Sequence, residues 1–344
     1  MRSVRLGKGG SAGMDVSNWD ILAPHAASRG AGVVLCVANQ KGGVGKTTTC
    51  VNLAAGLALA GYSVAVVDLD PQANATTGLG LDHRTVERSS YSLIMGSASL
   101  DEVAVATSVP GLSCVPSSLD LAGAEIELVA AMEREHRLAE SLAEAPQRYE
   151  IVLLDCPPSL GLLTVNALVA ARDVLVPVQC EFYALEAVAR LLGSAERVRA
   201  ALNPELRIGG VVLTMYDART RLAEQVALEV RGYFGDLVYD TVVPRSVRLS
   251  EAPSFGEPVV TLDPGSRGSQ AYRALAGEVA GRYRLDGPLT RLPAPPGGRA
   301  YGTRASEPDG LEQAWPRVDP WARRAEEGAA ATSEQEHAAG GPER

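Results

Sequence analysis

One glycine-rich turn limits the choice of fold more than any other segment of this sequence. The turn, NQKGGVGKTTT at residues 39–49, follows an apolar run at 33–38 and precedes apolar positions at helical spacing that end at Gly61. Strand, glycine-rich loop and helix in this order form the context of a P-loop, which binds phosphate groups. The alternative is a turn that only joins a strand to a helix. The order of these elements favours the P-loop.

The distribution of lysine supports a phosphate-binding role for this turn. The chain contains 32 lysines and arginines, yet only three are lysine, and two of these, Lys41 and Lys46, lie in the turn. A compact ammonium group on a flexible stem suits contacts with phosphate oxygens. A chain that otherwise uses arginine has therefore kept lysine where an ammonium group is useful.

The residues of the turn have expected roles in binding a nucleoside triphosphate with Mg²⁺. Backbone N–H groups of such a turn point inward around an anion, and the following helix N-terminus adds partial positive charge. Lys46 is expected to reach the outer phosphates, and Thr47 to offer its hydroxyl to Mg²⁺. Gln40 replaces the first glycine of G-x-x-x-x-G-K-[ST], so this is a variant P-loop. The predicted nucleotide contacts are Lys41, Gly42, Gly43, Val44, Gly45, Lys46, Thr47 and Thr48.

Several segments resemble the ParA/MinD group of ATPases, whose deviant P-loop reads KGGVGKTT as it does here. The similarity continues through residues 64–76 (VAVVDLDPQANAT) and 151–159 (IVLLDCPPS), and covers roughly residues 31 to 283. Residues 213–220 and 247–254 resemble the Soj-type chromosomal ParA branch in particular. The resemblance implies a P-loop ATPase whose cofactors are ATP and Mg²⁺.

The pattern of apolar segments predicts an α/β fold with a doubly wound, mostly parallel sheet and helices on both faces. Apolar strands alternate with helical patterns, which implies parallel strands joined by right-handed crossovers. Ser117-x-x-Asp120 predicts the start of one long amphipathic helix that reaches about Glu144, and apolar spacing from Leu185 predicts another that stops before Pro204. The predicted strands are 33–38, 63–68, 151–155, 173–178 and 208–214.

Three aspartates are expected at the carboxyl ends of the strands, where ligands of such sheets bind. Asp155 ends an apolar strand and fits the Walker B position, which holds the hydration shell of Mg²⁺. Asp68 and Asp70 flank Leu69, so in an extended segment both would face one way. The resemblance implies that hydrolysis depends on Asp70 and that Asp68 supports the metal. The alternative for these aspartates is that they only cap the following loops.

The resemblance gives Lys41 and Gly42 roles in an ATP-dependent homodimer. In this family the second lysine reaches the phosphates of the opposite subunit, which resembles an arginine finger supplied by a partner. Two loops that meet across such an interface leave no room for a Cβ at Gly42. The alternative is a Lys41 that only adds charge within its own loop. Catalytic roles are thus predicted for Lys41, Lys46 and Asp70.

The remaining predicted contacts also rest on the resemblance. It places adenine against the loops that follow the later strands, where Met215 and Pro244 are expected walls. A net charge of −9 disfavours a nucleic-acid binder, whose affinity comes largely from neutralising phosphates. The family instead binds double-stranded DNA without sequence preference through arginines of a dimer, and Arg219 and Arg248 stand at the matching positions.

The two ends depart from the ATPase segment. Residues 1–30 read as a flexible leader without the apolar core of a signal peptide. Residues 284–344, rich in Pro, Gly, Ala and Glu, are expected to be a disordered tail. Within the tail, Trp315 and Trp321 suggest a short docking motif, the alternative being an unselected extension. The ATPase domain is predicted at 31–283.

The leading functional prediction is a partition ATPase that is weak unless stimulated, binds DNA as an ATP-dependent dimer, and is released when a ParB-like centromere-binding partner stimulates hydrolysis. The implied location is cytoplasmic and nucleoid-associated, with no membrane partner. A MinD-like positioning ATPase is the alternative, although residues 328–344 lack the basic amphipathic helix it needs. An iron–sulfur carrier would need paired interface cysteines, for which only Cys156 and Cys180 are candidates.

Overall fold

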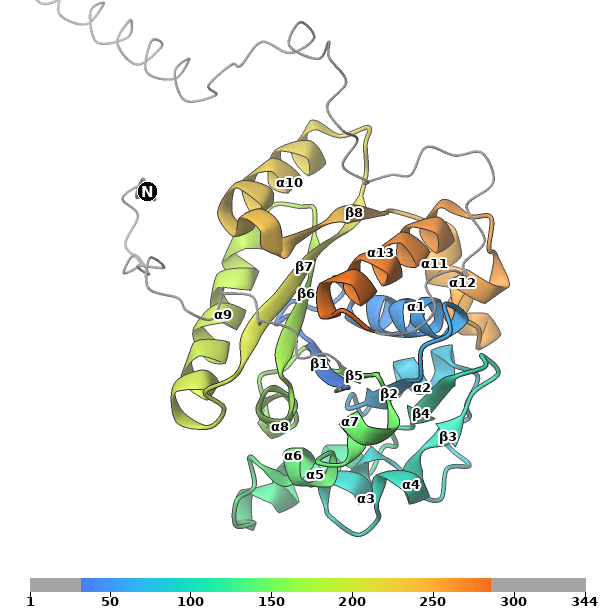
Figure 1. Cartoon of the computed structure of the whole chain (residues 1–344). Helices are drawn as coiled ribbons and strands as arrows, with labels where there is room; N and C mark the ends of the chain where they lie inside the picture. The colour runs from blue at the N-terminus through green and yellow to red at the C-terminus, as the bar shows by residue number, and fades with distance from the viewer. Residues whose placement is uncertain (1–31, 286–344) are drawn as a thin grey trace, which may run out of the picture. The chain divides into compact units, whose positions relative to one another are not determined.

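The computed structural model describes residues 32–285, which contain one eight-stranded sheet between two layers of helices (Figure 1). The strand order is β3-β4-β2-β5-β1-β6-β7-β8, and every pair is parallel except β3 with β4. The strands are β1 (Val33–Val37), β2 (Val64–Asp68), β3 (Val105–Ala106), β4 (Leu112–Val115), β5 (Ile151–Asp155), β6 (Asp173–Gln179), β7 (Arg207–Tyr216) and β8 (Val238–Pro244).

Helices cover both faces of this sheet, as a doubly wound α/β fold requires. On one face α1 packs against β2, β5 and α13, and on the other α8 packs against α6 and α9 (Figure 1). The α-helices are α1 (Lys46–Leu59), α2 (Asn74–Gly78), α3 (Ser90–Ile94), α4 (Leu100–Val103), α5 (Leu121–Glu127), α6 (Arg137–Ser141), α7 (Ala145–Arg148), α8 (Leu162–Ala170), α9 (Ala184–Ala201), α10 (Arg221–Phe234), α11 (Val247–Glu251), α12 (Val259–Leu262) and α13 (Arg267–Tyr283).

Short 3₁₀ turns link several of these helices. They are η2 (Leu128–Ala130), η3 (Gly235–Leu237) and η4 (Ala252–Phe255). The predicted fold class is confirmed. The predicted leader, and the tail from residue 286, lie outside the described residues, so the predicted domain boundaries stay predictions.

The central strands are apolar along their whole length because both of their faces are covered by helices. All five residues of β1, β2 and β5 are buried, including the aspartates that end β2 and β5. Two hydrophobic clusters, one on each face of the sheet, form the core. The predicted strand at 151–155 has the same bounds as β5, and the other predicted strands agree with the observed ones to within two residues.

The prediction of one long helix from Ser117 to about Glu144 was wrong. The segment forms α5, η2 and α6, with extended backbone at Ala131 and a positive φ of 51° at Glu133. The reason lies in α8: the Asn166 side chain accepts from the N–H of Leu138 (3.1 Å) and donates to the carbonyl of Arg134 (2.8 Å). Those two backbone groups would bond to each other in a continuous helix.

Candidate functional site

The P-loop joins β1 to α1 and has the backbone conformation that its glycines predict. Gly43 and Gly45 have φ of +75° and +89°, in the left-handed region that side chains disfavour. Gly42 has no such φ, and a Cβ built on Gly42 meets no atom within 4 Å. The loop therefore needs glycine at 43 and 45 for its own shape, whereas within one chain Gly42 is free of such a need.

Polar contacts fix the loop to the neighbouring strands. Asn39 accepts from the Lys41 N–H (3.0 Å) and donates to the carbonyl of Pro177 in β6 (2.8 Å). The Thr214 hydroxyl in β7 donates to the carbonyl of the buried Val44 (2.8 Å). These anchors hold the loop over the carboxyl edge of the sheet before any ligand binds, which lowers the cost of ordering it on binding.

Lys46 opens α1 and points back across the loop. Its side chain is buried, and its ammonium group donates to the carbonyl of Lys41 at 3.3 Å. Burial lowers the pKa of Lys46, while Asp155 and Asp70 act in the opposite direction. Thr47 and Thr48 follow in the first turn of α1 and remain partly exposed. Lys46, Thr47 and Thr48 thus lie directly beside the loop, and their contacts with a nucleotide stay predictions.

Lys41 points toward the end of β6, where it forms an ion pair with Glu181. The two side chains are 32% and 38% exposed, so the pair lies at the surface of the chain. Gln179 donates to the second oxygen of Glu181 (2.7 Å), which orients the carboxylate. No role was predicted for Glu181, because a contact between residues 140 positions apart leaves no signal in the sequence.

Asp68 ends β2 with its carboxylate held by protein donors. One oxygen accepts from the Asp70 N–H (3.1 Å), and the other accepts from the N–H and hydroxyl of Thr76 (2.8 and 2.7 Å). Burial raises the pKa of Asp68 to about 6, against the effect of these hydrogen bonds. The contacts show that Asp68 caps the following loop, as the alternative prediction held; its role toward a metal stays a prediction.

Asp155 differs because neither of its carboxylate oxygens has a hydrogen-bond partner among the described residues, although both are buried. It lies beside Val37 of β1 and Asp68 of β2. Burial and the neighbouring Asp68 raise the pKa of Asp155 well above its ordinary value; the Thr47 hydroxyl and Lys46 are near enough to counteract this shift, although among the described residues no hydrogen bond to Asp155 has good geometry. A buried carboxylate without a partner is costly unless something pairs with it. Its place beneath the loop suits a hydrated cation.

The predicted Mg²⁺ ligands fit a site that needs the nucleotide to complete it. Among residues 32–285, no group of three or more His, Cys, Asp or Glu side chains is arranged to hold a metal ion. Mg²⁺ is commonly bound through one or two protein oxygens plus phosphates and water. The Thr47 hydroxyl and the unpaired Asp155 carboxylate are such oxygens, so they would hold the ion together with bound phosphates.

Asp70 stands after the end of β2, and its side chain is turned into the loop. One oxygen accepts from the Gln72 N–H (2.9 Å), and the residue is 9% exposed. The N–H of Asp70 in turn binds Asp68, so the two aspartates are linked. Residue 68 ends the strand and the turn begins only at Pro71, so the prediction that Asp68 and Asp70 face one way stays a prediction. Only one Asp70 carboxylate oxygen has a hydrogen-bond donor among the described residues.

The two predicted adenine walls lie on neighbouring strands. Met215 has a positive φ of 51°, in the left-handed region that a non-glycine residue rarely adopts. Pro244 ends β8, where it is the register partner of Tyr216, the residue after Met215. Because Thr214 binds the P-loop, this edge borders the phosphate cradle. The adenine contacts themselves stay predictions.

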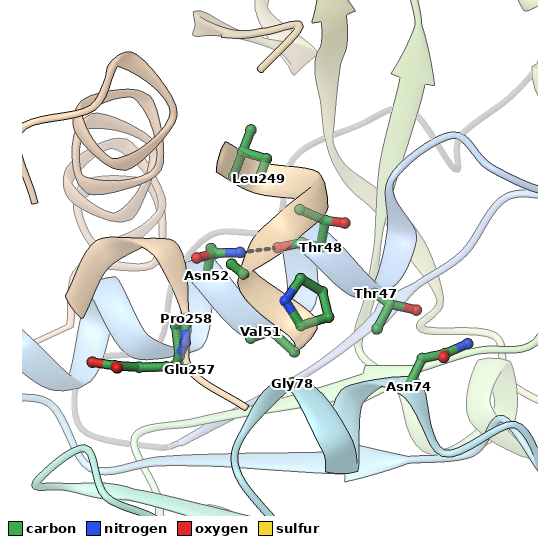
Figure 2. Close-up of a pocket in the computed structure, with 11 residues that line it drawn as sticks. Thr47, Thr48, Val51, Asn52, Asn74, Gly78, Leu249, Glu257 and Pro258 are labelled. Atoms are coloured by element: carbon green, nitrogen blue, oxygen red, sulfur yellow. Dashed lines mark hydrogen bonds between the residues drawn. The ribbon is translucent and has the colours of Figure 1, made fainter. Parts of the chain in front are cut away.

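A cavity of about 240 Å³ lies beside the cradle, between α1, α2 and the segment from α11 to α12. Figure 2 shows Thr47 and Asn74 on one side of this cavity and Glu257 and Pro258 on the other. Of the predicted site residues, only Thr47 and Thr48 line it. The full lining is Thr47, Thr48, Val51, Asn52, Asn74, Gly78, Leu249, Ala252, Pro253, Glu257 and Pro258.

The predicted DNA contacts, Arg219 and Arg248, follow the ends of the adjacent strands β7 and β8, on the same edge of the sheet as the P-loop. Arg219 is 87% exposed and forms a bidentate ion pair with Asp217 (2.9 and 2.7 Å). Arg248 is paired with Glu251 and Asp263. Exposed ion pairs contribute about 0–1 kcal/mol. Both arginines are therefore held only weakly by their acidic partners.

The two cysteines considered for an iron–sulfur cluster are buried, at 1% exposure for Cys156 and 7% for Cys180. The Cys156 sulfur contacts Cys36 at 3.3 Å, and this contact together with burial raises the pKa of Cys156 well above the ordinary value. Neither thiol is presented at the surface for a cluster shared between subunits.

Comparison with known proteins gives consistent results. A family model described as an AAA domain matches residues 32–208. The chain is 53% identical over 249 residues to the sporulation initiation inhibitor protein Soj of Bacillus subtilis, covering 72% of this chain and 98% of that protein. It is 54% identical over 253 residues to the chromosome partitioning protein ParA of Caulobacter vibrioides, covering 73% and 95%.

Solved structures share the fold. A cobyrinic acid a,c-diamide synthase from Mycobacterium smegmatis with bound ADP and magnesium has a TM-score of 0.65 and 35% identity, covering 80% of this chain and 99% of that one. The septum site-determining protein MinD from Pyrococcus horikoshii, complexed with Mg-ADP, has a TM-score of 0.58 and 25% identity, covering 72% and 95%. Across residues 32–285, no helix is both long and apolar enough to span a membrane.

Proposed function

Because this chain belongs to the ParA/Soj family of chromosome-partitioning ATPases, in the deviant P-loop ParA/MinD group, we propose that it is an ATP-driven switch for DNA segregation. In this proposal ATP with Mg²⁺ drives formation of a homodimer, and the dimer binds double-stranded DNA without sequence preference. A ParB-like centromere-binding partner then stimulates hydrolysis and so releases the dimer. The proposed location is the cytoplasm, on the nucleoid.

The observation that supports this proposal most strongly is that the two P-loop lysines lie in different environments. Lys46 is buried in the cradle, beside its own loop carbonyls and near Asp155. Lys41 leaves the same loop in another direction and is held at the surface by Glu181. A lysine that bound only the phosphates of its own loop would be expected to point toward that loop, as Lys46 does. This direction supports the proposal that Lys41 serves phosphates of a second subunit.

The buried carboxylates support hydrolysis within each subunit. A bound Mg-ATP supplies the phosphoanhydride bond and the metal charge that stabilises its cleavage. Asp155 and Thr47 would hold the metal, and Lys46 would neutralise the outer phosphates. Asp70 would orient the attacking water with its remaining carboxylate oxygen. Activity is weak until a second subunit and a partner bring Lys41 and Asp70 into place.

The arrangement of the surface arginines supports DNA binding by a dimer and not by a single subunit. The chain carries a net charge of −9, so one subunit has little attraction for DNA. Arg219 and Arg248 lie at the ends of adjacent strands, and a two-fold dimer doubles the row of arginines along one face. Contacts of this kind bind phosphates and read no base sequence.

The direct test of the switch is the mass of the full-length chain by light scattering with Mg²⁺ and no nucleotide, ADP, ATP or a non-hydrolysable analogue. The proposal expects a monomer without nucleotide and with ADP, and a dimer with the analogue. A dimer whose formation is independent of the nucleotide would contradict the proposal, and so would a monomer in every state.

A further inference from the structure

The first turn of α8 follows the loop that leaves Asp155, and its own sequence supplies no cap. Residues 156–161 form this loop, and Gly161 is the N-cap of α8. Ser, Thr, Asp or Asn at an N-cap offers an oxygen to the N–H groups of the first turn, whereas glycine has no side chain to offer one. An acceptor for this turn must therefore come from another part of the molecule or from solvent.

Glu125 of α5 brings a carboxylate to this position. A Cβ built on Gly161 would overlap Oε1 of Glu125 and lie 2.9 Å from its Cδ, so the carboxylate rests on the Gly161 backbone. Oε1 is buried and has no hydrogen-bond partner among residues 32–285. Because a negative charge at a helix N-terminus is favourable, Glu125 lies where a capping carboxylate would be expected.

The loop at residues 156–161 has contacts at its start, in its middle and at its end. The Cys156 sulfur lies 3.3 Å from that of Cys36 in β1, and the Thr164 hydroxyl donates to the carbonyl of Ser159 (2.7 Å). The first contact fixes the loop to the sheet, and the second fixes it only to its own helix. The position of the end of the loop relative to the sheet therefore depends on the contact with α5.

The segment that carries this carboxylate is tied at its other end to Asp68. The Ser117 N–H donates to the Thr76 hydroxyl (2.9 Å), and that hydroxyl donates to the Asp68 carboxylate (2.7 Å). Asp68 is also the register partner of Asp155. Residues 117–125 thus connect the turn after β2 with the loop after β5, on both sides of the buried aspartate pair.

α5 is itself held in place by the core. Leu121 and Ala124 are fully buried in the cluster that also contains residues of α8. On the exposed side, the Tyr91 hydroxyl donates to Glu127 (3.0 Å). The backbone of Glu125 is therefore fixed on both sides. A carboxylate on a fixed backbone loses little conformational freedom when it contacts the loop.

We propose that Glu125 is a positioning residue for ATP hydrolysis, which holds the first turn of α8 and thereby the loop that follows Asp155. The inference rests on the ATPase activity proposed above. A loop position that gives the buried Oε1 an N–H donor is favoured over others, because a buried acceptor without a donor is costly. Asp155 is then kept in line with the phosphates, whereas a displacement of about 1 Å at such a site can slow an enzyme up to roughly a hundredfold.

The test is ATP hydrolysis by the full-length protein with Mg²⁺ and random-sequence duplex DNA. Rates are expressed per active site, and active sites are counted by binding of a fluorescent ATP analogue. The proteins are wild type, Glu125→Ala, Glu125→Gln and Glu127→Ala. Glutamine removes the charge but keeps an oxygen that accepts hydrogen bonds. Glu127 is an exposed acid of the same helix, which makes it a matched control.

We expect Glu125→Ala to lower kcat about tenfold while KM for ATP changes by less than about twofold. Glu125→Gln should keep most of kcat, because its amide oxygen can accept from the same N–H groups, and Glu127→Ala should match wild type. An unchanged kcat per active site in Glu125→Ala would overturn the proposal. So would a rise in KM alone, or a loss only in the number of active sites, because a merely structural residue changes the amount of folded protein.

A second pair of variants tests the contact itself. Gly161→Ala places a methyl group where the carboxylate lies, so it should displace Glu125 and cause a similar loss of kcat. The losses from Gly161→Ala and Glu125→Ala should not add in the double variant, because both remove the same contact. Additive losses would overturn the proposal. Wild type that hydrolyses no ATP would refute the proposed function together with this inference, whereas an unchanged Glu125→Ala refutes the inference alone.

Discussion

Lys41 of the P-loop forms an ion pair with Glu181, two residues after the end of β6, and Gln179 donates to the other oxygen of that carboxylate. The pair holds Lys41 within its own subunit. If Lys41 serves the phosphates of a second subunit, the pair must open when the dimer forms, and its strength opposes dimerisation.

Glu181→Gln is therefore expected to strengthen the ATP-dependent dimer. Exposed ion pairs contribute up to about 1 kcal/mol each, and each subunit of the dimer opens one, so the dimer dissociation constant should fall by up to roughly thirtyfold. Sedimentation with a non-hydrolysable ATP analogue measures this constant. Glu186→Gln is the control, since Glu186 is an exposed acid of α9 that pairs with Arg190. Weaker dimerisation of Glu181→Gln would mean that Glu181 supports the dimer instead.

Gly42→Val is expected to spare the monomer and prevent the dimer. The structure leaves open space for a Cβ at Gly42, whereas Gly43 has a positive φ that a valine resists. Gly42→Val should therefore bind ATP in equilibrium dialysis and remain monomeric in light scattering with the analogue. Gly43→Val, the comparison variant, should lose ATP binding itself. A dimer of Gly42→Val with ATP would contradict the role given to this glycine.

Asp70→Asn is expected to separate binding from hydrolysis. The amide oxygen can still accept from the Gln72 N–H, so the loop should keep its shape. A residue that orients or activates water contributes about a hundredfold or more to the rate. We expect unchanged dimerisation with ATP and a loss of phosphate release of that size. Hydrolysis at the wild-type rate would show that Asp70 takes no part in ATP hydrolysis.

Asp155→Asn is expected to stabilise the nucleotide-free protein while weakening its response to Mg-ATP. Removal of an unpaired buried charge at a functional site typically adds about 1 kcal/mol to the free energy of unfolding. Denaturant unfolding at pH 8 in the presence of a chelator measures the stability of the nucleotide-free protein. The same experiment with Mg-ATP measures how much the nucleotide stabilises it. Asp240→Asn, at an exposed position of β8, is the control.

The buried aspartates Asp68 and Asp155 predict that the stability of the protein depends on pH. Burial raises the pKa of Asp68 to about 6 and that of Asp155 well above the ordinary value. The folded state then binds these protons more tightly than the unfolded state does, so the free energy of unfolding falls as pH rises from about 4 through about 6. The fall should be smaller in Asp155→Asn; an equal fall in both proteins would exclude Asp155 as its source.

Elements that depend on local pattern were predictable from the sequence, and those that depend on distant contacts were not. The strand ending at Asp155 and the glycine-rich loop follow from short apolar runs and turn chemistry. The break between α5 and α6 depends on Asn166, and the pairing of Lys41 depends on Glu181, both far along the chain. Strands β4 and β8, which were not predicted, are likewise positioned by packing on neighbours.

The central claim is that the protein binds DNA only as an ATP-bound dimer. It is tested most directly by binding to random-sequence duplex DNA with no nucleotide, ADP, ATP and a non-hydrolysable analogue, across a salt series, for wild type and Arg219→Glu with Arg248→Glu. We expect binding only with ATP or its analogue, weakening as salt rises, and absent in the double variant. No DNA binding in any nucleotide state, from a protein that still dimerises with ATP, would contradict the account.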